Sequence, residues 1–487
     1  MENRWLLIYD RYKNLQKTAI NMLSGIISGY LSYVLPIKCI DELTEETIKN
    51  FNVLVVGKIR NNHLLLSLKQ RGLIKVPNQS QGYSIYVGEN PEQANRQIIA
   101  IAGFDDHGVL YGCMDFCNRY CGKLLYQTGN LYGRPFFENR FDGQLTSWQI
   151  STYPKIKTRA IWTWGHVIYD YRTFFRNMVR LRLNEIIIWN DVVPVNAKDI
   201  VQYAHSLGIK VIWGFAWGWD NNCTRVLENY NEDTAQEIKE SVLKKYEKEY
   251  AAIGGDGIYF QSFTELDKEC VAGRLIAQVV TDLVNDTASE LLKRYPNLNI
   301  QFGLHSMSVK NRLNIIKSID KRIHIVWEDC GAFPFNYNPN AIGNFEETLN
   351  FTSDILSLRG EEEKFGAVLK GMVNLDWATF EHFTDNYILG ERTVQYLNER
   401  QIEKNKIWKL IQASWLKNAE YARKMISFIA TNGKCPIVQG LVEDGMFENK
   451  IMFPVALFAE LLWDANDNIG NMIEDVSKYP CVTFANV

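Results

Sequence analysis

Three short apolar runs of the chain end in carboxylates, the side chains that most readily serve as acid and base. Residues 256–266, DGIYFQSFTEL, begin as a buried strand and end near Glu265. Glu328 and Asp329 follow RIHIVW, and Asp376 follows VLKGMVNL. A carboxyl group partly removed from water keeps its proton to higher pH, as protonation of a glycosidic oxygen requires. We predict Glu265 as the acid and Glu328 as the second carboxylate, with Asp376 next and Asp329 as a further candidate.

Alternation along residues 256–266 predicts which way the side chains face. Successive side chains of a strand point to opposite faces, so Tyr259, Gln261, Phe263 and Glu265 should share one side. Glu265 would then emerge beside aromatic side chains at the carboxyl end of the strand. A simpler interpretation is that Glu265 caps a helix or forms a surface ion pair.

Tryptophan is concentrated in runs of the same kind. The chain has 13 Trp, and eight of them lie at 162, 164, 189, 213, 217, 219, 327 and 377. Indole rings stack on the apolar faces of sugars, while sugar hydroxyls need polar partners. The plainer alternative is that these rings only cap the fold. We expect the sugar subsite to be lined by Trp164, Trp189, Asn190, Trp219, Asp220, His305 and Trp377.

The elements that must position these residues alternate between strand and helix. The seven strand-like runs are residues 158–166, 184–191, 210–220, 257–265, 299–308, 322–330 and 367–377. Helix-length spacers such as 171–183, 197–207 and 233–250 separate them. Such alternation predicts parallel strands and a (β/α)8 TIM-type barrel, whose active site lies at the carboxyl ends of its strands. An eighth strand is not evident.

The chain divides into three predicted parts. Residues 1–150 alternate helix-like and strand-like runs, including NVLVVG and YSIYVG, and predict a small α/β domain. The barrel occupies 151–395. Residues 396–487 predict a helical C-terminal region, with a long helix over 402–430 and two shorter helices over 453–476.

Composition and motifs exclude several classes of protein. The 487 residues are 46% hydrophobic and 22% charged, with a net charge of −3 and no basic stripe, so no nucleic-acid partner is expected. No apolar run is long enough to span a membrane, and no export signal is evident, which favours the cytoplasm. Cys113, Cys117 and Cys121 predict one packed helix face. The dispersed His residues and the absence of HExxH, GxSxG and P-loop motifs predict no metal and no cofactor.

Two segments resemble known glycosidases. IIAIAGFDDHGVLYGCMDF, residues 98–116, resembles the end of the small α/β domain that precedes the barrel in family 20 β-N-acetylhexosaminidases and family 67 α-glucuronidases. KTRAIW, residues 157–162, is similar to the start of their first barrel strand, and this resemblance implies that Arg159 binds sugar hydroxyls. ALFAELLWD, residues 456–464, resembles the helical region of related bacterial glycosidase-like proteins.

One departure separates the chain from family 20. That family ends its fourth strand with an Asp–Glu pair, whose Asp orients the acetamido group of the substrate, whereas this chain has Thr264–Glu265. Family 67 pairs a fourth-strand Glu acid with carboxylates on later strands, a layout similar to Glu265 with Glu328 or Asp376. The resemblance therefore implies a glycosidase, hexosaminidase-like or glucuronidase-like, and leaves the sugar open.

These observations predict an exo-acting glycoside hydrolase with a carbohydrate substrate. A non-catalytic carbohydrate-binding protein on the same scaffold is the chief alternative, and a barrel enzyme with a non-sugar substrate is the second. Linkage, anomer, oligomeric state, and retention or inversion of configuration stay open at this point, because the stereochemical outcome depends on the separation of the two carboxyl groups.

Overall fold

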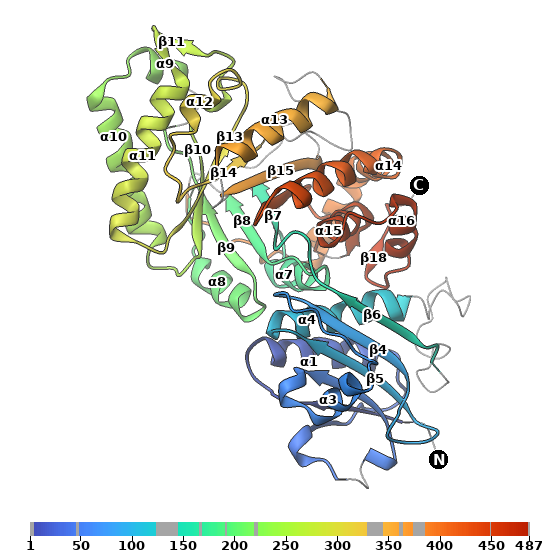
Figure 1. Cartoon of the computed structure of the whole chain (residues 1–487). Helices are drawn as coiled ribbons and strands as arrows, with labels where there is room; N and C mark the ends of the chain where they lie inside the picture. Colours follow the sequence, from blue (N-terminus) through green and yellow to red (C-terminus); the bar gives the residue numbers. More distant parts are fainter. Residues whose placement is uncertain are drawn as a thin grey trace.

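A closed barrel of eight parallel strands forms the centre of the chain (Figure 1). The computed structural model describes residues 4–44, 48–122, 145–164, 168–189, 192–218, 223–328, 344–359, 364–373, 385–448 and 450–485. The barrel strands are β7 (Thr158–Trp164), β8 (Glu185–Trp189), β9 (Lys210–Gly214), β10 (Gly257–Gln261), β13 (Asn299–Leu304), β14 (His324–Trp327), β15 (Phe365–Met372) and β16 (Ile437–Val442). Six of these strands lie within the predicted runs, β15 overlaps the run at 367–377, and the predicted barrel is confirmed.

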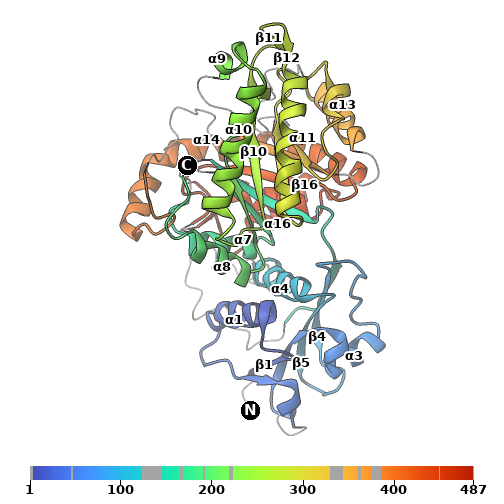
Figure 2. The same cartoon turned by 90° about the vertical axis from the view of Figure 1, so that its left-hand side faces the viewer.

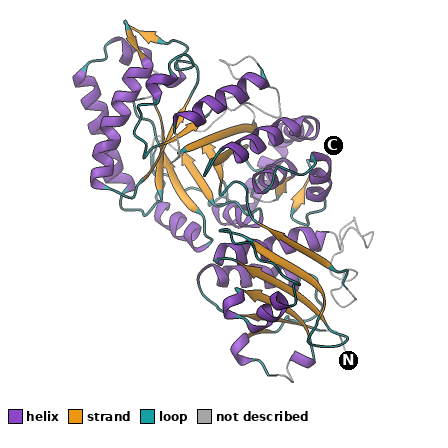
Figure 3. Ribbon diagram, viewed as in Figure 1, coloured by secondary structure: helices purple, strands orange, loops and turns teal. Residues whose placement is uncertain are grey.

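Helices lie around the outside of the barrel strands (Figure 3). They are α7 (Tyr171–Arg180), α8 (Ala197–Ser206), α9 (Cys223–Glu228), α10 (Glu232–Lys245), α11 (Ile276–Arg294), α12 (Leu313–Ile316), α13 (Phe345–Leu358) and α14 (Val394–Asn432). In Figure 2, α10 and α11 stand side by side in front of β10. A hairpin of β11 (Cys270–Val271) and β12 (Arg274–Leu275) precedes α11.

The eighth strand, β16, is the main difference from the sequence-based expectation. It follows the 39-residue helix α14 and pairs with β15 and β7, which closes the barrel. The barrel therefore runs to Val442 and extends past the expected boundary at residue 395. Gly440 interrupts the apolar run of β16 because a Cβ there would lie 2.6 Å from the ring of Phe458. The close packing of α15 (Phe453–Trp463) on the barrel thus requires a glycine within β16, and this glycine weakens the strand pattern in the sequence.

The N-terminal part is an α/β domain built on a six-stranded sheet, with strand order β2-β1-β3-β5-β4-β6. Its strands are β1 (Trp5–Tyr9), β2 (Ile37–Cys39), β3 (Asn52–Gly57), β4 (Tyr83–Glu89), β5 (Gln97–Gly103) and β6 (Trp148–Thr152). Its helices are α1 (Asn14–Ser28), α3 (His63–Gln70) and α4 (Asp106–Asp115). Asp105 caps α4 by accepting the Gly108 N–H. Cys113, Cys117 and Cys121 are buried, as expected of a packed helix face.

The α/β domain packs against the amino-terminal end of the barrel. The Thr18 hydroxyl of α1 donates to the carbonyl of Ser206, at the end of α8, and His107 of α4 contacts the carbonyl of Gly208. Of the C-terminal helices, α15 packs beside β16, and α16 (Ile469–Ser477) packs against α15 and α14. Within the described ranges, none of the helices is both long and apolar enough to cross a membrane.

A buried ionic cluster joins the three parts. Arg182, just before β8, donates to the hydroxyl of Tyr83 at 2.8 Å and contacts the carboxylates of Asp115 and Glu460. Arg119 bonds the same two carboxylates at 2.8 Å each. Burial raises the pKa of Glu460, but the charges of Arg182 and Arg119 outweigh burial and lower it. The cluster therefore contains buried charges that are paired with one another.

A chain of polar side chains crosses the barrel interior near its amino-terminal end. Gln439 Nε2 donates to Gln301 Oε1 at 2.8 Å, and Gln301 Nε2 donates to Glu185 Oε1 at 2.9 Å. Burial raises the pKa of Glu185 from 4.5 to about 7, although the bond from Gln301 lowers it in part. Glu185 therefore holds its proton in the folded chain at pH values where the unfolded chain has lost it.

We expect this carboxyl group to make stability depend on pH. Because its folded pKa is raised, its stabilising effect is complete below pH 4.5 and is lost as pH rises through about 7. The loss amounts to about 3 kcal/mol. Urea unfolding at pH 5 and pH 8 should show this decline in the native chain and a smaller one in Glu185→Gln. The surface variant Glu290→Gln serves as the control, and an equal decline in all three proteins would contradict the assignment.

Candidate active site

The candidate site lies at the carboxyl-terminal end of the barrel and is centred on Glu328. This residue directly follows β14, and its N–H donates to the carbonyl of Leu304 at 3.0 Å. It is 1% exposed. Gly303, on the adjacent strand β13, gives the carboxylate room, because a Cβ there would lie 2.1 Å from Glu328 Oε1. The backbone of β13 thus admits a charged group into the barrel.

Four side chains from three neighbouring strands surround the Glu328 carboxylate. The hydroxyl of Tyr259 donates to Oε1 at 2.6 Å, and Gln261 Nε2 lies 2.7 Å from each oxygen. His305 Nε2 is 3.1 Å from Oε2, and Lys370 Nζ is 3.7 Å from it. All four donor groups therefore converge on one anion inside the barrel.

This environment keeps Glu328 ionised. Burial alone raises the pKa of a carboxyl group, but here the charge and hydrogen bond of His305, the charge of Lys370 and the bond from Tyr259 together lower it to about 2. A group with so low a pKa cannot serve as a general acid near neutral pH. It can stabilise positive charge that develops above it.

Substitution of Gly303 tests this arrangement. Gly303→Ala should lower the free energy of unfolding by about 1–3 kcal/mol, because the added methyl group would clash with the Glu328 carboxylate and with the Tyr259 hydroxyl, 2.6 Å away. Chemical unfolding monitored by circular dichroism measures the change. The matched control is Gly25→Ala in α1, where a Cβ meets nothing within 4 Å. That control should gain about 0.5–1 kcal/mol, and equal stability of the two variants would contradict the prediction.

Glu265 lies at the same end of the barrel, one turn beyond strand β10. The strand ends at Gln261, and Phe263–Glu265 forms a short 3₁₀ helix, η5. The prediction that Phe263 and Glu265 continue the strand alternation is therefore wrong, because a 3₁₀ turn rotates successive side chains by about 120° instead of 180°. Phe263 packs in the outer core, and Glu265 is half-buried.

Thr264, the residue before Glu265, joins two strands. Its hydroxyl oxygen accepts the N–H of His305 at 3.2 Å, and its carbonyl accepts the hydroxyl of Ser308 at 2.8 Å. Thr264 therefore fixes the end of β10 to the residues that follow β13. It also ties the segment that carries Glu265 to the segment that carries His305, a contact of Glu328.

The aromatic side chains divide between the inside and the outside of the barrel. Trp189 packs inside, 6.1 Å from the ring of Tyr259, and Trp162 lies 5.8 Å from the same ring. Trp213 and Trp327 instead pack in the outer core, as alternation along their strands requires, and Trp217, which follows β9, also packs there. Of the Trp rings predicted at the mouth of the barrel, and among the described side chains, only Trp162 and Trp189 therefore lie inside, beside the Tyr259 ring whose hydroxyl bonds Glu328.

Arg159 is not brought to this site. It is the second residue of β7, at the amino-terminal end of the barrel, and its neighbour Ala160 faces the interior. Its guanidinium donates to the carbonyl oxygens of Arg182 and Ile156 and lies 5.1 Å from the ring of Trp463. Arg159 thus supports the junction between the barrel and the C-terminal helices and lies apart from the proposed site.

Several predicted site residues lie outside the described residues. These are Asp329, Asp376, Asn190, Trp219, Asp220 and Trp377, together with the side chain of Trp164. Of the predicted set, the structure brings Glu328, His305 and Trp189 together with Tyr259. It adds Gln261 and Lys370, which the sequence interpretation left without a role. A lysine inside the apolar strand AVLKGMV was the available signal, because a buried ammonium group needs an anionic partner.

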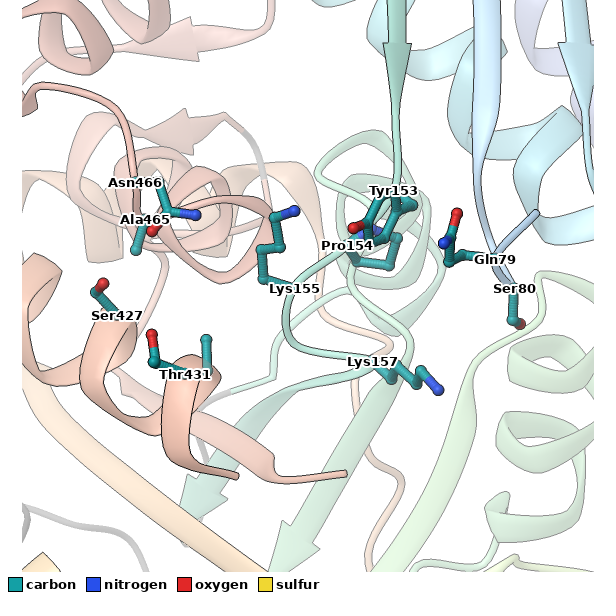
Figure 4. A pocket seen from close by; sticks show the side chains of 11 residues that line it. Gln79, Ser80, Tyr153, Pro154, Lys155, Lys157, Ser427, Thr431, Ala465 and Asn466 are labelled. Carbon is teal, nitrogen blue, oxygen red and sulfur yellow. The ribbon is translucent and has the colours of Figure 1, made fainter. Parts of the chain in front are cut away.

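A separate cavity of about 290 Å³ lies at the opposite end of the barrel (Figure 4). Tyr153, Lys155 and Lys157 line it just before β7 begins, and Thr431 lines it at the end of α14. The amine of Lys155 lies over the ring of Tyr153 at 4.2 Å. None of the predicted site residues lines this cavity, so we place the candidate site at the Glu328 end.

Known structures share this fold. A family 20 β-N-acetylhexosaminidase from Streptomyces coelicolor A3(2) matches with a TM-score of 0.52 at 9% identity, over 97% of this chain and 90% of its own. A family 138 enzyme targeting pectin rhamnogalacturonan II matches with a TM-score of 0.50 at 10% identity, over 95% of this chain and 51% of its own. No family model and no curated protein matches the sequence. The chain therefore has a fold found in glycoside hydrolases of more than one family.

Proposed function

We propose that the chain is an exo-acting glycoside hydrolase that removes a terminal sugar from an oligosaccharide or glycoconjugate. The observation that carries the proposal is the ionised Glu328, held by four side chains at the carboxyl-terminal end of a barrel, where barrel enzymes place their chemistry. The shared fold of the family 20 and family 138 enzymes supports it. The sugar is of the hexosaminide or glucuronide type that the sequence resemblance implies.

The two carboxylates take different roles in this proposal. Glu265 protonates the glycosidic oxygen as it leaves. Glu328 stays ionised and stabilises the positive charge of the oxocarbenium-like transition state. Its oxygens are already bonded to Tyr259, Gln261 and His305, which favours a fixed charge over a nucleophile that must reach the anomeric carbon. Asp376 remains the alternative second carboxylate.

A screen of aryl glycosides tests the proposal. The purified chain is incubated with aryl N-acetylglucosaminide, glucuronide, galactoside and glucoside, and release of the phenol is followed. We expect turnover of one member of the panel. If no member reacts while Trp fluorescence responds to free sugars, the carbohydrate-binding alternative is favoured. A metal or cofactor that copurifies with the chain would favour a barrel enzyme with another substrate.

The proposed setting is the cytoplasm. Each cysteine whose side chain the structure describes is free, and Cys113, Cys117 and Cys121 are buried. Unpaired cysteines fit a reducing compartment.

A further inference from the structure

The structure places one more carboxylate at the end of the barrel where Glu328 lies. Glu443 directly follows β16, and its N–H donates to the carbonyl of Met372 at 2.7 Å. The ladder between β15 and β16 therefore continues one residue beyond the last residue assigned to β16. Glu443 is 6% exposed. No sequence signal pointed to it, because its strand was not recognised.

Alternation along β16 places Glu443 on the interior side of the barrel. Gln439 bonds Gln301, which belongs to a strand that is not adjacent to β16, so the bond crosses the barrel interior. Leu441 packs in the interior cluster with Trp162 and Tyr259. Because residues i, i+2 and i+4 of a strand share a face, Glu443 follows these two residues on the interior side.

Barrel closure sets Glu443 opposite Glu265. The strand order is β10-β13-β14-β15-β16-β7-β8-β9, so β10 and β16 are four strands apart in either direction. Glu265 follows β10, and Glu443 extends β16. Inverting glycosidases need an acid on one side of the sugar and a base on the other, with room between them for a water molecule. The strand order therefore places the two residues on opposite sides of the barrel axis.

A lysine from the long outer helix α14 holds Glu443. Lys404 Nζ lies 2.8 Å from Glu443 Oε1 and 3.6 Å from Asp444 Oδ2, and Lys404 is itself buried. Asp444 in turn accepts bonds from Arg400 at 2.8 Å and from the hydroxyl of Tyr169 at 2.6 Å. Glu443 is thus held by an ion pair with Lys404, and the ammonium group of Lys404 also lies near a second carboxylate, that of Asp444.

We propose that Glu443 is the general base of an inverting hydrolysis and that Lys404 is its positioning residue; the inference rests on the proposed function. In this step a water molecule gives a proton to the Glu443 carboxylate, and its oxygen bonds to the anomeric carbon. The glycosidic C–O bond breaks, and Glu265 gives its proton to the departing oxygen. The products are an alcohol and a sugar of inverted configuration, and both carboxyl groups then regain their starting states through solvent.

The test uses the aryl glycoside that the native chain hydrolyses. Proton NMR of fresh product should show the inverted anomer first. Glu443→Ala should lower kcat about 100- to 10,000-fold with little change in KM, and azide should restore turnover by forming a glycosyl azide of inverted configuration. Rescue by azide also shows that the variant is folded. The control is Glu420→Gln, which alters a surface ion pair of α14 and should leave kcat unchanged.

Lys404 is tested by a pair of variants. Lys404→Met should lower kcat more than it changes KM. Lys404→Arg should restore most of kcat, which a purely structural role would not predict. A retained anomer, or a Glu443→Ala variant within tenfold of native kcat, would overturn the inference while the glycosidase proposal stands. A native chain that hydrolyses no glycoside would overturn both.

Discussion

Replacing Glu265 with glutamine is expected to lower kcat by about 100- to 10,000-fold on a glycoside with a poor leaving group. Glutamine keeps the shape of the side chain and has no proton to give. A dinitrophenyl glycoside needs little help from an acid, because its leaving group departs as a stable anion. The loss should therefore be much smaller on that substrate.

The matched control is Asp267→Asn, which removes an exposed carboxylate two residues further along the chain. It should behave as the native chain does. An equal loss on both substrates for Glu265→Gln would indicate that the residue binds the sugar or supports the fold. Native turnover in Glu265→Gln would remove the residue from the mechanism and leave the acid to be found elsewhere.

The second large effect concerns the buried ionic cluster. Arg182→Met is expected to lower the free energy of unfolding by about 3–5 kcal/mol, because it leaves the carboxylates of Asp115 and Glu460 buried with only Arg119 as a cation. The exposed Arg294 also pairs with two carboxylates, and Arg294→Met should change stability by less than about 1 kcal/mol. Urea unfolding of both variants at pH 7 measures the difference.

The same cluster predicts a response to acid. Because the folded pKa of Glu460 is lowered, its stabilising effect is present above the unfolded pKa and is lost as pH falls through the folded value. Arg182→Met should therefore lose less stability than the native chain between pH 7 and pH 3. Parallel curves would show that the cluster does not couple to proton binding.

Much of the fold could be predicted from the sequence, since local signals were strong. The run NEIIIWND became β8, and the spacer at 197–207 became α8, because period and length agree there. The eighth strand could not be found in the same way. It is only six residues long, and Gly440, which packs against Phe458, interrupts its apolar pattern. It also follows a 39-residue helix whose sequence predicts a separate helical region.

The candidate site was predictable only in part. Glu328 and His305 could be placed because they follow strands, and the ends of parallel strands meet at one end of a barrel. Arg159 was assigned by resemblance alone. Strand alternation instead indicates that Arg159 faces outward, because Ala160 and Trp162 face the barrel interior and the residues next to them must face outward. The bonds that hold Glu328 ionised come from separate strands, and no local pattern in the sequence reports them.

The position of β16 also has a consequence for synthesis of the chain. Strands β7 and β15 keep unpaired edges until β16 joins them, and α14 is made between β15 and β16. The α/β domain leaves the ribosome before the barrel and can form its six-stranded sheet early. The nascent barrel remains open, and open strand edges invite pairing with other chains. We therefore expect chains that stop before Val442 to aggregate, whereas chains that extend past it fold.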